Sequence, residues 1–546
     1  MTLLRARLPV RYGRQLVAAA FVSIFVALPA AQAPVFYRFS FPERNQRVMH
    51  VEVTFPDIPP DPLEVLMSRS SPGRYAIHDF ASHVLDVSAT DSAGRALTIE
   101  HPNPNQWTVS GHSGEVRLSY RVRGDQVNGT YLGVDGTHAH INMPAAIIWG
   151  RGLEKRGLAL RFEPPPGTSW RVATQLLTGR DAFSYSAPNL QYLMDSPTEV
   201  SAFALRTFTV GDNGRTPVFR VAVHHSGTDA ELDAFVRDVE SIVRETRYVF
   251  GEYPRFEGNT YTFIADYLLG NNDDGMEHRN SAVLTSSRSI RNDRMNRLIA
   301  VSHEFCHAWN AERIRPASLE PFNFEETNVS GELWFAEGFC NYYGSLVLRR
   351  SGLWSVRDFA RDIGEAISDV VRRPGRETRS VVEMSRLAPL MDGADSADSA
   401  LSSNFVSYYT WGEALAVGLD LMLRDRTGGR VTLDDYMRAL WAKFGRAGGR
   451  LPGYVELPYT ETDLKRMLAD VSGDAAFADG FFARFVDGRE VIDYAPLLAR
   501  AGLIVRTAGP TSTFDVVPVE DTGQRATDEQ QRFRDGWLSS GARNVF

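Results

Sequence analysis

The stretch HEFCH at residues 303–307 places two histidines four residues apart, with a glutamate directly after the first. On a helix, this spacing puts both imidazoles on one face, where they can share one tetrahedral zinc ion. His303 and His307 are therefore candidate metal ligands. Glu304 is placed to act as a base on a water molecule instead of binding the metal. The stretch predicts the metal centre of a zinc hydrolase.

The residues around this stretch favour a helix. Between residues 294 and 311, apolar side chains recur at steps of three and four, and no proline or glycine occurs before Pro316. This period is typical of an amphipathic helix. The apolar positions are Met295, Leu298, Ile299, Phe305 and Trp309.

A third ligand is expected from the stretch LWFAEGFCNYY at residues 333–343, whose only acid is Glu337. A lone carboxylate among aromatic residues is costly to bury unless it is paired or bound to a metal. Glu326 and Glu332 are alternatives by spacing, but their polar and glycine-containing surroundings favour loops. Two histidines and one glutamate leave a fourth position for water, which is typical of a catalytic zinc site.

Together these motifs resemble the glycyl aminopeptidase family of gluzincin metallopeptidases. The resemblance lies in HEFCHAWNAERIRP at residues 303–316, in residues 333–343, in GMEHRN at 275–280 and in YYTWGEALAVGLDLMLR at 408–424. It continues through residues 481–503, which end in YAPLLARAGL, and therefore covers most of the chain. It implies a thermolysin-like catalytic domain behind a β-rich domain, and aminopeptidase activity that favours small N-terminal residues.

The resemblance also implies two roles that spacing does not supply. The segment Gly-Met-Glu at residues 275–277 resembles the loop of gluzincin aminopeptidases whose glutamate binds the free α-ammonium of the substrate, which matches Glu277 to that role. From the residues alone, Glu277 is interpreted as a solvated acid in an acidic loop. His278, where asparagine is common, is given no role. Tyr409, in a Tyr-x-x-Gly pattern, resembles the tyrosine that hydrogen-bonds the oxyanion, and Tyr408 is the alternative because the register is open by one residue.

Two further features concern the ligand helices. Asn341 follows Glu337 by one helical turn, so its carboxamide oxygen could accept the spare N–H of a ligating imidazole, or it could cap a local turn. Cys306 and Cys340 lie three residues after His303 and Glu337 respectively. A disulfide between them would join the two ligand helices, but two small buried thiols are the simpler interpretation.

Residues 1–33 have the layout of a secretory signal peptide. Four arginines precede an apolar run of 13 residues at 16–28, and Ala-Ala-Gln-Ala follows at 30–33. The run is short for a membrane span, although an uncleaved signal anchor is the alternative. We therefore expect an exported protein, periplasmic or secreted, with no stable membrane insertion after cleavage.

The charge of the chain argues against several classes of partner. The formal net charge is −8, and it becomes −12 without residues 1–33, which carry four arginines and no acids. Nucleic acid and an anionic membrane surface are therefore disfavoured as partners. A peptide substrate with a free, cationic N-terminus is compatible with this charge. The sequence does not predict an oligomeric state.

The patterns along the chain predict an α+β protein. Short alternating strands between Gly and Pro turns fill residues 34–212, which are interpreted as a β-rich, sandwich-like N-terminal domain. Residues 213–505 are interpreted as the thermolysin-like, gluzincin catalytic domain with a helical C-terminal part. Residues 506–546 are interpreted as a polar tail, about half the length that a PDZ domain needs, and residues 520–534 within it as solvated or weakly helical.

Three functions are compatible with this sequence. The favoured one is a zinc-dependent aminopeptidase that hydrolyses the N-terminal peptide bond of short peptides, with Gly and Ala preferred. The second is a zinc endopeptidase on the same site, which requires that Glu277 does not reach the cleft. The third is a non-catalytic peptide-binding protein on a peptidase fold. The presence of Glu304 beside a full set of ligands disfavours the third.

Overall fold

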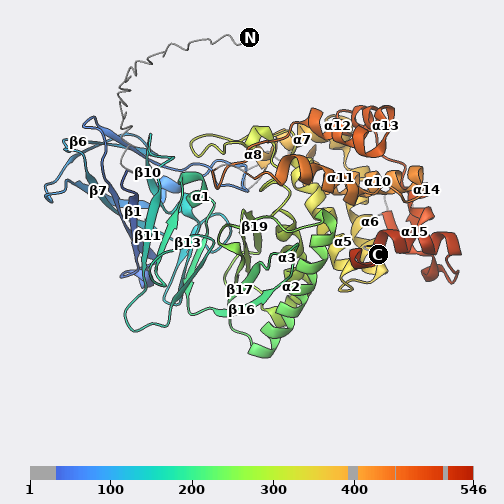
Figure 1. Ribbon diagram of the computed structural model, residues 1–546, viewed down its shortest axis with the longest axis horizontal. Coiled ribbons are helices and arrows are strands. Elements are labelled where there is room, and N and C mark those ends of the chain that lie inside the picture. Colours follow the sequence, from blue (N-terminus) through green and yellow to red (C-terminus); the bar gives the residue numbers. More distant parts are fainter. Residues whose placement is uncertain (1–31, 392–403, 449–450, 508–513, 545–546) are drawn as a thin grey trace, which may run out of the picture.

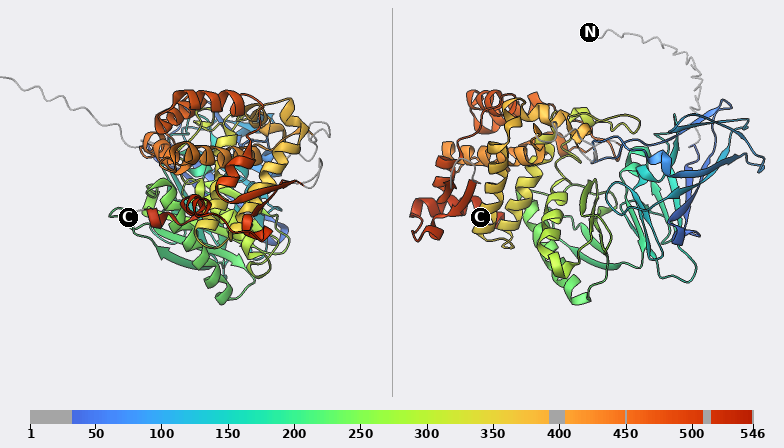
Figure 2. Two further views of the ribbon diagram at one scale, coloured as in Figure 1. Left: turned by 90° about the vertical axis from the view of Figure 1, so that its right-hand side faces the viewer. Right: turned by 180° about the vertical axis from the view of Figure 1, so that it is seen from behind.

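The computed structural model describes residues 32–391, 404–448, 451–507 and 514–544. A β-rich region lies at one end of the molecule, a further sheet with long helices lies near the centre, and helices fill the other end (Figure 1). Figure 2 shows the same order from behind. This arrangement confirms the predicted α+β class. The predicted signal peptide lies almost entirely outside the described residues.

The N-terminal region consists of three sheets around one hydrophobic core. Burial alternates residue by residue along strands such as β7 (Val116–Arg123), as expected where one sheet face covers a core. The seven-stranded sheet has the order β13 (Leu177–Thr178), β14 (Ser184–Ala187), β11 (Leu158–Glu163), β1 (Val35–Ser40), β2 (Val48–Phe55), β7 and β4 (Val84–Thr90). The second sheet has the order β10 (Ile148–Gly150), β3 (Leu63–Met67), β6 (Gln106–Ser110) and β5 (Thr98–Asn103). The third has the order β12 (Arg171–Thr174), β15 (Thr198–Ser201), β9 (His138–Ile141) and β8 (Leu132–Val134).

A five-stranded mixed sheet follows at the centre of the molecule. Its order is β16 (Ala204–Thr209), β17 (Val218–His225), β18 (Thr260–Tyr267), β20 (Ser281–Ser286) and β19 (Asp274–His278). Strands β17, β18 and β20 are parallel, whereas the edge strands β16 and β19 run antiparallel to their neighbours. Helices α2 (Asp229–Phe250) and α3 (Ile290–Cys306) pack against each other and against this sheet (Figure 1).

The rest of the chain is largely helical, and it shares one hydrophobic core with the five-stranded sheet. Several of its helices begin at a Ser or Thr whose side chain caps the first turn, together with an acid or amide three residues later. After the short α1 (Leu190–Met194), the helices are α4 (Leu333–Ala336), α5 (Gly338–Arg350), α6 (Val356–Arg372), α7 (Val381–Arg386), α8 (Ala388–Met391), α10 (Tyr408–Thr427), α11 (Leu433–Leu440), α12 (Glu461–Ser472), α13 (Ala475–Phe481), α14 (Tyr494–Arg500) and α15 (Asp528–Leu538).

The described part of the C-terminal segment has regular structure, and residues 520–534 are mostly exposed and enter a helix at Asp528. Strand β21 (Leu503–Thr507) pairs with β22 (Phe514–Pro518), and α15 packs on the helical region. Trp537 on α15 is fully buried, and its indole N–H donates to the Tyr342 hydroxyl at 2.8 Å. The buried Leu538 and Arg534 and a capping box at Thr527 also hold this helix in place.

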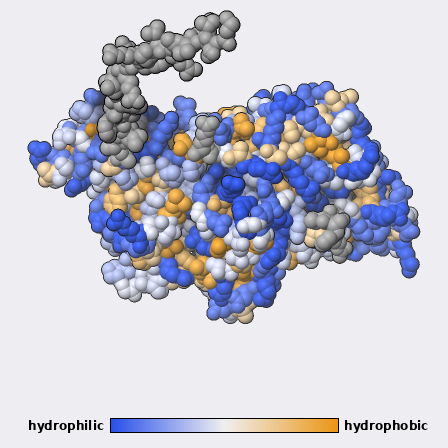
Figure 3. Space-filling view, in the orientation of Figure 1, coloured by the Kyte–Doolittle hydropathy of each residue, from blue (hydrophilic) through white to orange (hydrophobic). Residues whose placement is uncertain are grey.

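The surface and the helices indicate whether any described segment could enter a membrane. On the face shown in Figure 3, hydrophobic residues lie in small groups among hydrophilic ones. Within the described ranges, no helix is both long enough and apolar enough to cross a membrane.

Candidate metal centre

Helix α3 carries the two histidines at its C-terminal end. The sequence predicted a helix up to residue 311, but α3 ends at Cys306 and the chain turns, with Ala311 at a φ of 84°. Within this turn, the Nδ1 atom of His307 lies 2.9 Å from the carbonyl oxygen of Asn310. That hydrogen bond places the proton of a neutral His307 on Nδ1 and leaves Nε2 as a lone-pair donor.

Three donor atoms converge beside α3. The Nε2 atoms of His303 and His307 are 3.1 Å apart. The Oε2 atom of Glu337 lies 3.2 Å from His307 Nε2 and 3.8 Å from His303 Nε2. A tetrahedral zinc ion at about 2.1 Å from each ligand would hold the ligand atoms about 3.3–3.4 Å apart. The donor types and their separations therefore fit a zinc ion with three protein ligands.

Glu337 is positioned from two sides. It lies between α4 and α5, where the Asn310 carboxamide donates to the carbonyl oxygens of Phe335 and Ala336 at 2.9 and 3.0 Å. The Tyr75 hydroxyl, from the N-terminal region, donates to Glu337 Oε1 at 2.6 Å. One carboxylate oxygen is thus held by Tyr75 while the other faces the histidines.

The two alternative acids lie elsewhere. Glu326 is exposed to solvent. Glu332 Oε2 accepts hydrogen bonds from the hydroxyls of Ser318 and Ser330 at 3.0 and 2.8 Å. Glu337 is therefore the acid of this stretch that the structure brings to both histidines.

Two glycines explain how α10 approaches this centre. A Cβ atom on Gly338 would lie 2.3 Å from Gly412 Cα, and one on Gly412 would lie 1.9 Å from the carbonyl oxygen of Trp334. The backbones of α10 and of α4–α5 therefore touch directly after Glu337. The glycine of the Tyr-x-x-Gly pattern is required by this close approach.

The contact between the helices brings both candidate tyrosines near the centre. The ring centroids of Tyr409 and His303 are 6.2 Å apart, and Tyr409 is partly exposed. Tyr408 is fully buried, with its ring centroid 6.2 Å from that of Tyr75. Of the two hydroxyl-bearing rings, Tyr409 is the one with access to solvent beside a candidate ligand.

The segment that was interpreted as the Glu277 loop is the edge strand β19, which passes over Glu304. A Cβ atom on Gly275 would lie 2.1 Å from Glu304 Oε1, so a larger residue there would force the Glu304 carboxylate to move. Glu277 is buried, and one of its oxygens lies within 4.8 Å of ligand atoms of His307 and Glu337. Burial raises the pKa of Glu277. Its interpretation as a solvated acid is therefore wrong.

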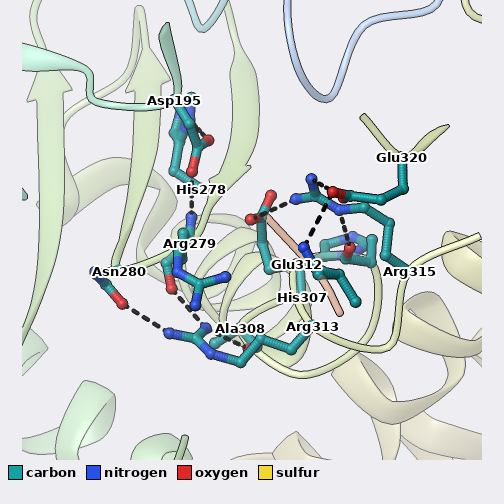
Figure 4. A network of polar contacts seen from close by, with 12 residues as sticks. Asp195, His278, Arg279, Asn280, His307, Ala308, Glu312, Arg313, Arg315 and Glu320 are labelled. Atoms are coloured by element: carbon teal, nitrogen blue, oxygen red, sulfur yellow. Dashed lines mark hydrogen bonds and ion pairs between the residues drawn. The ribbon is translucent and has the colours of Figure 1, made fainter. Parts of the chain in front are cut away.

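A polar network fixes β19 relative to the turn after α3 (Figure 4). The buried Arg313 guanidinium donates to oxygens of three residues at 2.8 Å each, namely Arg279, Ala308 and Asn280. His278, to which the sequence assigned no role, lies with Nδ1 2.8 Å from Asp195 Oδ1. These contacts hold the strand that carries Glu277 against the chain that follows His307.

The N-terminal region also reaches β19. Arg74 forms an ion pair with Asp274. The backbone N–H of Gly129 donates to the same carboxylate, at 2.9 Å from Oδ2. Together with the Tyr75 hydrogen bond, these contacts make the β-rich region part of the wall around the metal centre.

Asn341 and the two cysteines lie behind the ligands. The Asn341 amide donates to Glu413 Oε2 at 3.4 Å. Burial and the neighbouring His307 lower the pKa of His303 to about 3, against the opposing effect of Glu337. His303 Nδ1 has no hydrogen-bond partner of good geometry among the described residues. Cys306 and Cys340 are buried free thiols, which confirms the simpler interpretation. Burial and a hydrogen bond with Cys306 raise the pKa of Cys340.

The sequence did not identify Tyr75, Asn310 or Arg313. Tyr75 precedes Glu337 by 262 positions and lies in a segment without any chemical pattern of its own. Asn310 and Arg313 lie within HEFCHAWNAERIRP, so the motif itself was the signal for them. Their function as hydrogen-bond donors to backbone carbonyls could not be derived without the turn that presents those carbonyls.

Comparisons with protein families match two parts of the chain. A model described as the peptidase M61 N-terminal domain matches residues 36–202. A model described as M61 glycyl aminopeptidase matches residues 296–415, a range that contains His303, His307 and Glu337. The two models together match more than half of the chain. Among curated proteins, none matches this sequence.

Solved structures show a related fold. An aminopeptidase N family protein from Idiomarina loihiensis is 24% identical over 87% of this chain and 80% of its own, with a TM-score of 0.76. An M1 zinc metallopeptidase from Deinococcus radiodurans is 16% identical over 84% of this chain and 95% of its own, with a TM-score of 0.48. The first likeness shows a shared fold, whereas the second is too loose to support an argument.

Proposed function

This chain belongs to the M61 glycyl aminopeptidase family, and on that premise we propose that it is a zinc-dependent aminopeptidase acting on short peptides with a free N-terminus. The observation that carries the proposal is the convergence of two imidazoles and a carboxylate at 3.1–3.8 Å inside the matched range. The preference for N-terminal Gly and Ala is part of the proposal. Export to the periplasm or the medium is also proposed, from the sequence of residues 1–33.

The residues that would hold zinc are His303 and His307 through Nε2 and Glu337 through Oε2. When bound, the ion would supply Lewis acidity and lower the pKa of a water molecule to about neutrality. Glu304 takes a proton from the attacking water and returns it to the leaving amine. Burial raises the pKa of Glu304, which suits a carboxylate that must both accept and donate a proton.

Tyr409 is the proposed donor to the oxyanion. Its ring lies beside His303 and is accessible from the cleft, whereas the ring of Tyr408 is fully buried against Tyr75. A donor aimed at the charge that develops in the transition state is worth about 3–4 kcal/mol. Asn341 is proposed to orient the His303 ring through its side chain.

Glu277 is proposed to bind the α-ammonium group of the substrate, which limits cleavage to the first peptide bond. It is supported in that role by its burial next to the ligand set and by the lack of a cationic side-chain partner in ion-pair contact with it among the described residues. A cavity of about 30 Å³ borders Glu277, with Gly73 and Tyr75 in its wall.

A zinc endopeptidase on the same site is the alternative. It would need an open cleft on both sides of the metal, and the edge strand with Glu277 narrows one side. A non-catalytic binding protein is disfavoured because Glu304 and Tyr409 accompany the full donor set.

The test is hydrolysis of aminoacyl p-nitroanilides, free and N-acetylated, by the purified chain with its zinc content measured. We expect cleavage of the free glycyl and alanyl compounds, no cleavage of the acetylated ones, and a Glu277→Gln variant with a KM raised more than kcat is lowered. Glu326→Gln, an exposed acid, is the matched control. Equal cleavage of acetylated substrates would overturn the aminopeptidase proposal in favour of the endopeptidase.

A further inference from the structure

Four side chains that the proposed function does not use meet between two sheets. His138 on β9 and Glu199 on β15 come from the N-terminal region, whereas His224 on β17 and Asp266 on β18 come from the five-stranded sheet. Glu199 and Asp266 are completely buried, and His138 and His224 expose 2% and 14% of their side chains. One potential ligand atom from each residue lies within 4.8 Å of the others.

Strand pairing explains why they face one another. β9 and β15 are antiparallel with His140 opposite Glu199, so His138, His140 and Glu199 point to the same face of their sheet. β17 and β18 are parallel with His224 opposite Asp266, so this pair also shares one face. The two sheets present these faces to each other where the N-terminal region joins the catalytic region.

The separations match those of zinc ligands. His138 Nδ1 lies 2.8 Å from Asp266 Oδ2 and 3.4 Å from Glu199 Oε1. His224 Nδ1 lies 3.4 Å from Asp266 Oδ1 and 3.9 Å from Glu199 Oε1. These values lie around the distance of about 3.3–3.4 Å that a tetrahedral zinc ion imposes on its ligand atoms. They resemble the 3.1–3.8 Å of the candidate catalytic centre.

The same atoms lack hydrogen bonds. Both carboxylate oxygens of Glu199 and of Asp266, and the Nδ1 atoms of His138 and His224, have no hydrogen-bond partner of acceptable geometry among the described residues. Buried polar atoms without a partner are costly, and two buried carboxylates also repel each other. Donors that converge at ion-pair distances, without a hydrogen bond of good geometry between them, are arranged as the ligands of a shared cation.

We propose that His138, Glu199, His224 and Asp266 form a second zinc site, which joins the N-terminal sheets to the five-stranded sheet. Four protein donors fill a tetrahedral coordination sphere, so the site is structural and leaves no position for substrate. Two imidazoles favour zinc over calcium or magnesium, which prefer oxygen ligands alone. The two carboxylates neutralise the charge of the ion.

The surroundings of the site support a metal. His138 Nε2 lies 3.6 Å from Asp135 Oδ2, the kind of contact that orients a ligating imidazole from behind. His140 Nδ1 lies 3.4 Å from the second Glu199 oxygen. A surface cavity of about 290 Å³ reaches His138, with Asp125 and Asp135 in its wall, and it offers a route for an ion.

The position of this site gives it a consequence for the catalytic region. Asp266 lies near the end of β18, and the chain then leads to β19 with Glu277. On the other side, the N-terminal region supplies Tyr75 to Glu337. A zinc ion between the two sheets would hold these elements at a fixed separation.

The test uses the full chain without an affinity tag, purified with added zinc and freed of excess metal by gel filtration. A His303→Ala/His307→Ala variant removes two candidate catalytic ligands and leaves the second site intact. Elemental analysis should find about two zinc ions per wild-type chain and about one in this variant. If the His303→Ala/His307→Ala variant is folded but holds no zinc, the proposal is wrong. That result is expected if the four residues form a metal-free network of ion pairs.

Two further measurements locate the remaining ion. In the His303→Ala/His307→Ala background, added His224→Ala should remove the last zinc, whereas His225→Ala should retain it because His225 is the neighbour on the opposite face of β17. Cobalt substituted into the background variant should give the visible absorption of a four-coordinate ion. A chelator should lower the Tm of that variant, and an unchanged Tm with no cobalt spectrum would refute the site even if His224→Ala fails to fold.

Discussion

The two candidate metal-binding clusters of this molecule are built in opposite ways. The candidate catalytic centre takes His303 and His307 from one helix, four residues apart, and a single acid from the next pair of helices. The cluster between the sheets takes one residue from each of four strands, spread from residue 138 to residue 266. The first is a local pattern that is completed by one distant residue, whereas the second exists only after two sheets have packed.

The clusters also differ in what they leave open. The helical centre has three protein donors, which leaves one position of a tetrahedral ion for water or substrate. The cluster between the sheets has four donors and two fully buried carboxylates. An open site suits catalysis and a closed site suits structure. Similar residues therefore serve different purposes according to the elements that present them.

Removing one histidine from each cluster gives the largest expected contrast. His303→Ala should abolish peptide hydrolysis and lower the Tm less than His224→Ala does, because the fold around α3 is also held by many other contacts. His224→Ala should retain most of the turnover at low temperature but lower the Tm by about 3 °C or more, because a ligand that binds only the folded state is lost. Turnover and thermal unfolding, measured on both variants, show whether activity and stability depend on different clusters. If His224→Ala lost activity and kept its Tm, the assignment of a structural role to the cluster between the sheets would be wrong.

Glu304→Gln separates proton transfer from metal binding within the helical centre. The amide cannot take a proton, so kcat should fall by about 10²–10⁴-fold while the zinc content stays that of the wild type. Elemental analysis and initial rates on glycyl p-nitroanilide measure the two quantities. Zinc lost along with activity would show that Glu304 is a ligand, and the assignment of roles would then be wrong.

Glu312 shows what a buried acid does in this region without imidazole partners. Burial, followed by the nearby Asp195, raises the pKa of Glu312 to about 7, against the opposing effect of Arg315. Because the folded state holds the proton more tightly than the unfolded one, stability is highest below the unfolded pKa of about 4.5 and decreases as the pH rises towards 7. Relative to Glu312→Gln, the wild type should lose up to about 3 kcal/mol of unfolding free energy over that range.

Urea unfolding of both proteins at pH 4.5, 5.5 and 7 measures this difference. Glu326→Gln, an exposed acid, is the control and should follow the wild type at every pH. A constant difference between wild type and Glu312→Gln across the range would mean that Glu312 stays ionised in the fold.

The contrast between the clusters also explains what the sequence could predict. A helical period is a local pattern, so the residues around HEFCH predicted a helix and the motif itself predicted two metal ligands and a base. Glu337 was predicted as the third ligand because it is the only acid in a stretch of aromatic residues. The end of that helix was placed five residues too late, because the apolar period continues to Trp309 although the chain turns after Cys306, with Ala311 at a φ of 84°. The resemblance supplied Glu277 and Tyr409, and the glycine contact between Gly338 and Gly412 gives a physical reason for the pattern around Tyr409.

The strand cluster had no such signal. Along a strand every second residue points inward, so His138, Glu199, His224 and Asp266 look like ordinary members of alternating strands. Which strands pair, and which sheets then face each other, depends on contacts far apart in the sequence. The fold class could therefore be predicted from patterns, whereas the joining of the two regions could not.

Tyr75 connects the N-terminal region to the candidate catalytic centre. Removing its hydroxyl is the smallest substitution that tests whether this contact matters for metal binding. Tyr75→Phe removes the 2.6 Å hydrogen bond to Glu337 Oε1 and keeps the buried ring. Loss of an outer hydrogen bond to a ligand should weaken zinc binding at the catalytic centre by about 10–100-fold, as measured by competition with a chelator, because the carboxylate is no longer held in place. Zinc bound by the residues between the sheets should be unaffected.

Tyr37→Phe is the matched control, because Tyr37 is also a buried tyrosine of the N-terminal region, but its hydroxyl donates to the backbone carbonyl of Ile148 at 2.9 Å. It should leave both zinc affinities at wild-type values. If Tyr75→Phe also leaves both unchanged, Glu337 is held in place by α4 and α5 alone, and the N-terminal region contributes only a wall to the cleft. If it weakens both, the two metal sites are coupled through the packing of the two regions, and the distinction between a catalytic and a structural cluster is less sharp than their geometry indicates.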